Sequence, residues 1–384
     1  MIDPLAVPLS LYVHLPWCTR KCPYCDFNSH EGFSASLQQP YVEALLSDFD
    51  SQHGWWSNRP IASIFIGGGT PSLFEGRWIS ALLEGIAARA TLLSNIEITL
   101  ESNPGSAESA QFVAYHAAGV NRLSIGVQSF LDDALEGLGR IHSGDEARHA
   151  LDLVSDAGFT RWNIDLMHGL PEQDIESAKA DLIEAIGRSA GHVSWYQLTI
   201  ERNTRFWSTP PPLPDDSALA TIQEAGEEIL CDAGLHQYEV SAFARKGEES
   251  QHNLNYWRFG DYIGLGAGAH GKISLPDGAI IRTQRTRTPA DYLALAASSP
   301  MPPPQETTLQ TPDRIAEFAM NTLRLKSGVP LSLFTQTTGA DIEQLVSAAR
   351  VAISRGWLEA PGKGQFVTTP LGYRFLDSVI ATFL

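Results

Sequence analysis

Short apolar runs alternate with segments of helical periodicity along the first half of the chain. Residues 9–15 (Leu-Ser-Leu-Tyr-Val-His-Leu) mix apolar and β-prone side chains and predict a strand. Five more runs rich in Ile, Leu or Val follow at residues 63–68, 97–103, 122–127, 161–167 and 192–200. Apolar runs of this length are typical of parallel strands that are buried on both faces.

Amphipathic helical patterns separate these strands. They cover residues 41–49, 78–90, 107–118, 145–157 and 175–188. Gly119, Gly158 and Gly191 stand where three of these helices are expected to end. Strand–helix alternation repeated six times predicts an α/β fold, an incomplete (β/α)6 TIM-like barrel rather than a closed eightfold one.

The pattern changes after residue 208. A proline-rich connector at 209–216 is followed by a predicted helix at 218–233 and a predicted strand at 236–244. A second proline-rich break at 299–304 precedes the last part of the chain. We therefore expect a partial barrel over residues 1–208, an extension of it over 209–298, and a small C-terminal domain over 299–384.

The C-terminal domain has its own order of elements. Helices are predicted at 314–325 and 341–355, then a hairpin around Gly362-Lys-Gly364 and a final helix near 372–383. Helices followed by a hairpin are similar to a small α+β, winged-helix-like module. The segment has few basic residues, so we interpret it as a structural cap without a role in DNA binding.

Composition and charge exclude several classes of protein. The 384 residues are 43% hydrophobic, which allows a substantial core. The net charge of −17 argues against a general nucleic-acid binder, because phosphate binding requires a basic surface. We find no apolar run of membrane-spanning length and no secretory signal before the first strand. The expected location is the cytoplasm.

Three of the four cysteines lie within eight residues, in the run Cys18-Thr-Arg-Lys-Cys22-Pro-Tyr-Cys25 directly after the first predicted strand. A [4Fe–4S] cluster normally takes four protein thiolates. Three close cysteines without a fourth nearby imply a cluster with one iron left open for a substrate or cofactor. The clustered, unpaired thiols also suit a reducing compartment.

Other interpretations of the cysteines are weaker. A structural zinc site would draw four Cys or His ligands from two pairs, and His14 and His30 flank the run without finger spacing. A disulfide framework fits poorly, because three thiols crowd one loop. Cys231 lies far away in a helical pattern, where we expect a buried, inert thiol.

Polar residues and glycines follow four successive predicted strands. Gly67-Gly68-Gly69-Thr70-Pro71 ends the second strand, while Glu101, Gln128 and Asp165 stand near the ends of the next three. The carboxyl ends of parallel strands carry the chemistry in folds of this type. Together these residues predict a binding mouth. Arg140 could bind a carboxylate there in a bidentate way, or be a surface arginine.

These motifs together carry a family resemblance. A strand followed by Cys-x3-Cys-x2-Cys and then Gly-Gly-Gly-Thr-Pro resembles the radical S-adenosylmethionine (SAM) superfamily. Four longer strings narrow the resemblance to one branch of the superfamily. They are residues 23–29 (Pro-Tyr-Cys-Asp-Phe-Asn-Ser), 125–130 (Ile-Gly-Val-Gln-Ser-Phe), 163–171 (Asn-Ile-Asp-Leu-Met-His-Gly-Leu-Pro) and 252–257 (His-Asn-Leu-Asn-Tyr-Trp). They are similar to the branch of oxygen-independent coproporphyrinogen III oxidase and its HemW-type heme chaperone relatives. The resemblance covers nearly the whole chain.

The resemblance implies roles for individual residues. Cys18, Cys22 and Cys25 would hold the cluster, and its open iron would bind the amino and carboxylate groups of SAM. The positions that match SAM contacts are Tyr12, Tyr24, Gly68, Gly69, Thr70, Glu101, Gln128, Arg140, Asp165 and Ala244. SAM bound in this way can be cleaved to methionine and a 5′-deoxyadenosyl radical when the cluster supplies an electron.

Two departures separate the chain from the oxidase. The oxidase carries a fourth cysteine two residues after the third, where this chain has Phe27. Its longer N-terminal arm is also missing, since eleven residues precede Tyr12. Both features match the heme chaperones. This resemblance implies that the partners are heme and heme-accepting proteins, including membrane-bound respiratory enzymes. It also implies that the protein switches between monomer and dimer. The oxidase remains the alternative, and a winged-helix regulator with a redox-sensing cluster is disfavoured by the acidic charge.

Heme binding requires an apolar slot and an axial ligand. The resemblance makes residues 209–298 the heme or substrate region and His252 the leading ligand candidate, with Tyr256 and Trp257 flanking the porphyrin. The alternative is that His252 is a packed, hydrogen-bonded side chain. His270, in the glycine-rich run 264–271, is a second candidate, although that run is better explained as a close approach of the backbone.

Overall fold

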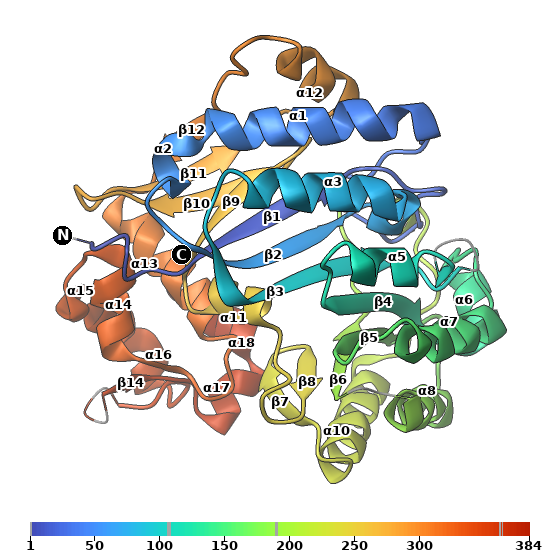
Figure 1. Ribbon diagram of the computed structural model, residues 1–384. Helices are drawn as coiled ribbons and strands as arrows, with labels where there is room; N and C mark the ends of the chain where they lie inside the picture. Colours follow the sequence, from blue (N-terminus) through green and yellow to red (C-terminus); the bar gives the residue numbers. More distant parts are fainter. Residues whose placement is uncertain (1, 106–108, 189–190, 361, 363) are drawn as a thin grey trace.

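Six parallel strands form the centre of the computed structural model, which describes residues 2–105, 109–188, 191–360, 362 and 364–384. They are β1 (Leu9–Leu15), β2 (Ile61–Gly68), β3 (Leu92–Ser102), β4 (Arg122–Gln128), β5 (Trp162–His168) and β6 (His192–Gln197). Each pairs in parallel with the next strand along the chain. The predicted incomplete barrel is confirmed as an open sheet (Figure 1).

Six further strands widen the sheet at both edges. Beyond β1 lie β9 (Asp261–Leu265), β10 (His270–Ser274), β11 (Ile280–Gln284) and β12 (Gln305–Thr308). Of these, β9 runs parallel to β1, and the others are antiparallel to their neighbours. Beyond β6 lie β8 (Ala242–Ala244) and β7 (His236–Glu239). The single strand predicted at 236–244 was therefore wrong: the chain turns at residues 240–241 into an antiparallel pair.

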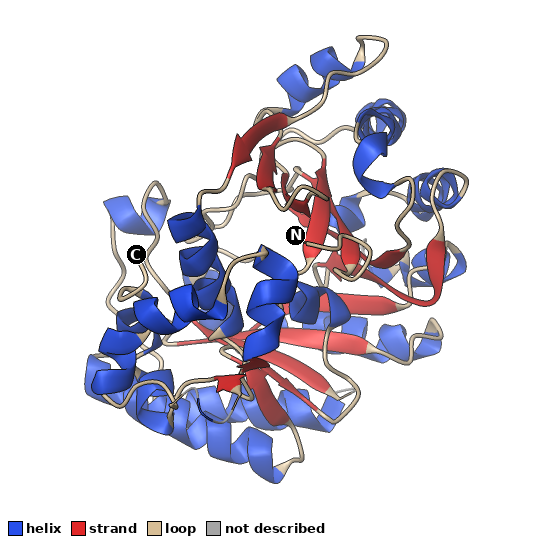
Figure 2. Ribbon diagram, turned by 90° about the vertical axis from the view of Figure 1, so that its left-hand side faces the viewer, coloured by secondary structure: helices blue, strands red, loops and turns tan. Residues whose placement is uncertain are grey.

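Helices cover the outer face of the parallel strands (Figures 1 and 2). The longer ones are α1 (Gln38–Ser51), α3 (Gly76–Ala87), α7 (Gly144–Asp156), α8 (Ile175–Arg188) and α10 (Asp216–Asp232). Shorter helices are α2 (His53–Trp56), α5 (Phe112–Ala117), α6 (Asp132–Gly137), α9 (Arg205–Ser208) and α12 (Pro289–Ala296). Another short helix, α11 (Gln251–Trp257), lies on the inner face of the sheet instead. The helix predicted at 107–118 begins partly outside the described residues.

Alternation along each strand separates an aliphatic outer face from an inner face of polar and aromatic side chains. Leu11, Val13 and Ile64 belong to the main core beneath the outer helices. Tyr12 and Phe65 are paired in register and line a cavity on the opposite face. Because side chains alternate along a strand, the core residues and the site residues share the same strands. The inner face is therefore available for binding.

The C-terminal domain packs around a second core. Its elements are α13 (Thr311–Thr322), β13 (Val329–Pro330), α14 (Leu331–Thr338), α15 (Ile342–Ala348), α16 (Arg350–Ser354), β14 (Gln365–Phe366), α17 (Pro370–Arg374) and α18 (Leu376–Ile380). Phe318, Phe334 and Phe366 meet in its core, which Ile2 and Val7 also join. The domain is coloured from orange to red in Figure 1.

The predicted C-terminal elements differ in detail from those observed. The helix expected at 341–355 is two helices, α15 and α16, and the last helix is likewise divided into α17 and α18. Residues 361 and 363 of the expected hairpin lie outside the described part of the chain. The segments that flank them are joined, because Leu358 bridges Thr368 and the Glu359 amide donates to the Val367 carbonyl oxygen, whereas β14 pairs with β13.

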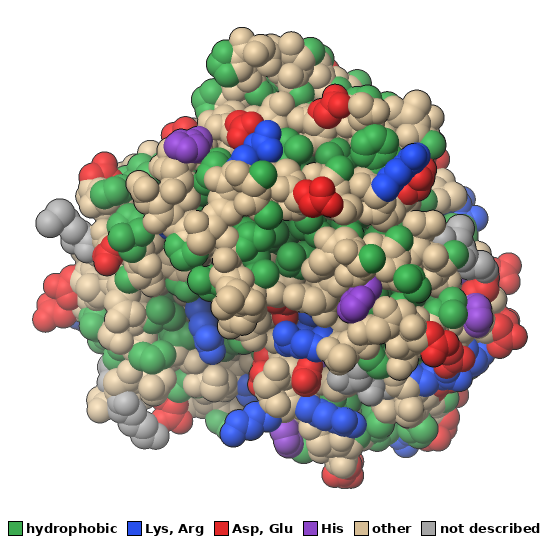
Figure 3. Space-filling model, in the orientation of Figure 1, with side chains coloured by type: hydrophobic (Ala, Val, Ile, Leu, Met, Phe, Trp, Pro, Cys, Tyr) green, Lys and Arg blue, Asp and Glu red, His purple; other side chains and the backbone are tan. Residues whose placement is uncertain are grey.

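Basic and acidic side chains are interspersed on the face shown in Figure 3. Within the part of the chain that the structure describes, none of the helices has both the length and the apolar character needed to cross a membrane.

Candidate functional site

The cysteine loop leaves the carboxyl end of β1 and is held by backbone hydrogen bonds. The Cys18 amide donates to the His30 carbonyl oxygen at 2.9 Å, and the Cys25 amide donates to the Cys22 carbonyl oxygen at 3.2 Å. The three thiols are half-buried and are not joined by a disulfide bond. Cys231, which we expected to be buried, is exposed on α10.

Two side chains donate hydrogen bonds to sulfurs of this loop. The Thr70 hydroxyl lies 3.4 Å from Cys18 Sγ, and Arg140 Nη1 lies 3.6 Å from Cys22 Sγ. Arg140 Nη2 also donates to the Asn103 side-chain oxygen at 2.6 Å and to the Gly126 carbonyl oxygen at 2.9 Å. The interpretation of Arg140 as a surface arginine was therefore wrong: its guanidinium joins the cysteine loop to the ends of β3 and β4.

The donor set fits thiolate ligation of an iron–sulfur cluster. Burial raises the pKa of the Cys18 and Cys25 thiols, and the Thr70 hydrogen bond to Cys18 acts in the opposite direction. Arg140 carries a buried Nε without a hydrogen-bond partner among the described residues, next to Cys22. A positive charge and N–H or O–H donors directed at sulfur stabilise the thiolate form that binds iron.

The site is not arranged for a single metal ion. Among the described residues, the structure has no group of three or more His, Cys, Asp or Glu side chains that could hold one. A [4Fe–4S] cluster makes a different demand, because each thiolate binds a different iron atom. Ligation of a cluster by Cys18, Cys22 and Cys25 is therefore a proposal, supported by the loop and its donors.

The glycine run at the end of β2 lets the loop pass against its neighbours. A Cβ atom on Gly69 would lie 2.5 Å from the Trp17 carbonyl oxygen, and Gly68 has a φ of +120°. The Gly69 amide donates to the Leu15 carbonyl oxygen, and the Thr70 amide donates to that of Trp17. Glycine is required here because any side chain would collide with the cysteine loop. The run thus positions Thr70 beside Cys18.

Two buried carboxyl groups lie on the inner face of the sheet. Glu101 on β3 accepts a hydrogen bond from the Gly68 amide at 3.1 Å, and burial together with Asp165 raises its pKa to about 8. Asp165 on β5 accepts from the Ser124 hydroxyl at 2.9 Å and from the Asn163 amide at 2.6 Å. Burial raises the pKa of Asp165 as well. Both groups could bind hydroxyl or amino groups of a ligand.

The structure brings most of the other predicted SAM contacts to the same edge of the sheet. Gln128 has a φ of +70° at the end of β4 and accepts a 2.6 Å hydrogen bond from the Tyr196 hydroxyl. Tyr24, which lies within the cysteine loop, packs against Phe206 of α9. Ala244 is not brought to this edge, because it pairs with His192 at the first residue of β6. Ala244 therefore lies near the amino ends of the parallel strands, away from the other predicted SAM contacts.

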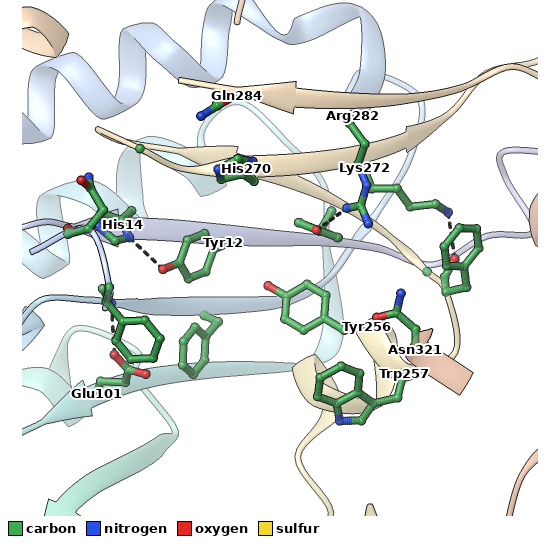
Figure 4. A pocket seen from close by; sticks show the side chains of 18 of the residues that line it. Tyr12, His14, Glu101, Tyr256, Trp257, His270, Lys272, Arg282, Gln284 and Asn321 are labelled. Carbon is green, nitrogen blue, oxygen red and sulfur yellow. Dashed lines mark hydrogen bonds between the residues drawn. The ribbon is translucent and has the colours of Figure 1, made fainter. Parts of the chain in front are cut away.

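A cavity of about 700 Å³ opens beside the cysteine loop, between the inner face of the sheet and α11 (Figure 4). Its aromatic lining consists of Tyr12, Phe27, Phe65, Tyr256, Trp257, Phe259 and Tyr262. Gly68 and Glu101 line it as well, so the cavity is continuous with the predicted SAM contacts. A second, open cleft of about 1030 Å³ is lined by Cys22, Cys25 and Arg140, among others.

His252 is held away from the cavity. Its Nδ1 lies 2.8 Å from the Ser250 hydroxyl and 3.5 Å from a carboxylate oxygen of Glu97. Its ring centre lies 3.9 Å from that of Phe65. Burial lowers the pKa of His252, and Glu97 opposes that shift. The observed contacts match the alternative interpretation of His252 as a packed, hydrogen-bonded side chain, while Tyr256 and Trp257 line the cavity.

Sequence reasoning missed the wall of the cavity that β10 and β11 supply. His270, which the sequence analysis named as a second ligand candidate, lies on this wall together with Arg282 and Gln284, which it did not name (Figure 4). The missed signal was Pro276-Asp277-Gly278, a turn sequence between two runs of β-prone residues. A Cβ atom on Gly264 would lie 2.1 Å from the His270 carbonyl oxygen, which confirms the close backbone approach expected for this run.

Asn28 was also not predicted as a residue of the site. Its side-chain amide donates to the carbonyl oxygens of Ala267 and Arg287, both at 2.9 Å. These bonds fasten the end of the cysteine loop to the segments that flank β10 and β11. The asparagine therefore connects the predicted cluster site to the wall of the cavity.

Comparisons with known proteins agree with this geometry. The family model "Radical SAM superfamily" matches residues 12–185, and "HemN C-terminal domain" matches residues 309–375. The heme chaperone HemW of Escherichia coli is 48% identical to the chain, over 98% of both proteins. The chain belongs to the HemW family. The HemW of Haemophilus influenzae is 45% identical, over 99% of both chains.

A solved structure supports the fold assignment. The coproporphyrinogen III oxidase HemN from Escherichia coli, described as a radical SAM enzyme, superposes with a TM-score of 0.82. The match covers 98% of this chain and 90% of that one at 20% identity. At this identity the likeness shows the shared fold, and HemW relatives rather than HemN share the closer sequence.

Proposed function

We propose that this protein is a heme chaperone that binds heme and passes it to acceptor proteins. The observation that carries the proposal is the identity of 45–48% over almost the whole length with two proteins named heme chaperone HemW. The aromatic cavity beside the cysteine loop supports it, because a porphyrin needs a large apolar slot. We expect the acceptors to include membrane-bound respiratory enzymes and the protein to work in the cytoplasm.

A resident [4Fe–4S] cluster with SAM at its open iron is part of the proposal. Cys18, Cys22 and Cys25 would hold the cluster, with Thr70 and Arg140 stabilising the thiolates. When bound, this pair of groups would supply one-electron chemistry. Glu101 would accept hydrogen bonds from hydroxyl groups of SAM, which its position beside Gly68 allows. On the resemblance, the cluster and SAM would govern a monomer–dimer switch or heme transfer rather than turnover of a substrate.

The alternative function is SAM-dependent decarboxylation of coproporphyrinogen III. The fold shared with HemN favours it, although the fold alone does not determine activity. Phe27 opposes it, since this side chain occupies the position of the oxidase's fourth cysteine. Phe27 is 65% exposed and lines the aromatic cavity, where it provides an apolar surface rather than a ligand.

One experiment separates the two functions. The full chain is reconstituted anaerobically with iron and sulfide, and the same preparation is then assayed for heme binding and for decarboxylation of coproporphyrinogen III. Stoichiometric heme uptake without decarboxylation supports the chaperone. SAM-dependent formation of protoporphyrinogen without heme uptake would refute it and establish the oxidase. HemN and a heme-free buffer blank provide the positive and negative controls.

A further inference from the structure

His270 faces the cavity with a free imidazole. It is the first residue of β10, lies opposite Gln284 of β11, and its exposed side chain lines the cavity. Among the described residues, its ring nitrogens form no hydrogen bond and no ion pair. In Figure 4, His270 lies on one wall, and Tyr256 and Trp257 lie across the cavity on α11. A flat ligand between these walls would meet the imidazole on one face and aromatic rings on the other.

The two other histidines near the cavity are already engaged. His14 uses both ring nitrogens, one with the Tyr12 hydroxyl and one with the Asn28 carbonyl oxygen, each at 2.8 Å. His252 uses Nδ1 with Ser250 and does not line the cavity. Ligation by either residue would require existing contacts to break or the side chain to move. His270 requires neither.

Charges around His270 favour the form that binds metal. Partial burial and the nearby guanidinium groups of Arg282 and Arg287 lower its pKa below the ordinary value, which favours the neutral imidazole. Arg282 is itself engaged by the Glu317 carboxylate at 2.6 Å and by the Tyr262 hydroxyl at 2.6 Å. Arg287 lines the cavity and forms no ion pair within the described part of the chain. One cation therefore remains for an anionic ligand group.

From these contacts we infer that His270 is the axial ligand of the heme iron and that Arg287 binds a heme propionate. The porphyrin lies between the β10–β11 wall and the rings of Tyr256 and Trp257. The inference rests on the proposed function, since it assigns residues to the heme that a chaperone would carry. It assigns His252 a structural role, in which it pairs with Glu97 beneath Phe65.

The test titrates hemin into four forms of the full chain: wild type, His270→Ala, His252→Ala and His236→Ala. His236 is the matched control, because it is an exposed histidine on edge strand β7 and does not line the cavity. The readouts are the dissociation constant and the electron paramagnetic resonance spectrum of the ferric heme. We expect His270→Ala to weaken binding at least about tenfold and to lose the imidazole-ligated spectrum, which added imidazole restores. His252→Ala and His236→Ala retain that spectrum.

Two results overturn the inference in distinguishable ways. If His270→Ala keeps the wild-type spectrum while His252→Ala loses it, His252 is the ligand and the proposed function stands. If the wild-type chain binds no heme, the proposed function fails together with the ligand assignment. His270→Gln serves as a second variant that keeps a polar side chain at the start of β10. Its spectrum should also lack the imidazole signature.

Arg287 is tested separately from the ligand. Arg287→Ala should weaken hemin binding by up to about fivefold, as expected for an exposed ion pair, without changing the ferric spectrum. Arg287→Lys should recover much of the affinity, and the effect of Arg287→Ala should shrink at high salt. Equal affinity of the wild type and Arg287→Ala at low salt would refute the propionate contact.

Discussion

Replacement of Glu101 by Gln should stabilise the metal-free protein at neutral and alkaline pH. The structure raises the pKa of this carboxyl from 4.5 to about 8, because it is buried and lies near Asp165. Between these two values the unfolded chain releases the proton and the folded chain keeps it. Stability therefore falls as the pH rises through this range. A Gln side chain keeps an oxygen for the Gly68 amide and cannot ionise.

The size of the effect follows from the shift. Each pKa unit corresponds to about 1.4 kcal/mol, so Glu101 costs about 3 kcal/mol of unfolding free energy at pH 7 and under about 1 kcal/mol at pH 5. Glu101→Gln should recover most of that cost at pH 7. A buried carboxyl that lowers the unfolding free energy at pH 7 fits a binding role better than a structural one. The same substitution should weaken SAM binding.

Urea unfolding of the metal-free chain at pH 5 and at pH 7 measures the difference. Glu306→Gln is the control, because Glu306 is an exposed residue of β12. The expected result is a gain that grows by about 2 kcal/mol between the two pH values for Glu101→Gln and by nothing for Glu306→Gln. Identical pH dependence of wild type and Glu101→Gln would show that Glu101 ionises freely in the folded state.

Three further substitutions test the cluster loop and the cavity. Cys22→Ser should abolish the cluster absorbance and leave the circular dichroism spectrum unchanged. The control Cys231→Ser, at an exposed position of α10, should keep the cluster. A full brown chromophore in Cys22→Ser would refute the ligand assignment. Arg140→Ala should lower the reduction potential by about 60 mV, since a charge-assisted hydrogen bond contributes about 1.5 kcal/mol; an unchanged redox titration would contradict this. Phe27→Ala should weaken heme binding about fivefold by loss of one aromatic contact, with the cluster intact, and unchanged affinity would place heme elsewhere.

The parallel strands were predictable because their periodicity is strong. All six follow from apolar runs, and β1 matches its predicted bounds. The polar residues at their ends could also be placed, since parallel strands align their carboxyl ends. What periodicity does not contain is the partner of each side chain. Ser250 and Glu97 hold His252 across 2 and 155 residues of sequence, so its orientation depends on tertiary packing.

Short antiparallel strands gave the opposite outcome. The strands β9 to β12 have four or five residues each, too few for alternation to distinguish them from loops. Because these strands were not predicted, Arg282 and Arg287 were absent from the predicted site, and His270 was named only as a second ligand candidate. The turn at Pro276-Asp277-Gly278 was readable, but the pairing of β9 with β1 depends on contacts between residues about 250 positions apart.

The open sheet leaves its two edges unpaired with each other, and α13 connects them. Arg282 of β11 is joined to Glu317 of α13, and Glu239 of β7 is joined to Arg324 just after that helix. The Lys326 amide also donates to the Tyr238 carbonyl oxygen. The C-terminal domain thus links the two ends of the open sheet. Loss of the Arg282–Glu317 pair should therefore loosen the contact between the cavity wall and the C-terminal domain, while the pairing of β10 with β9 and the Asn28 hydrogen bonds still hold that wall to the sheet.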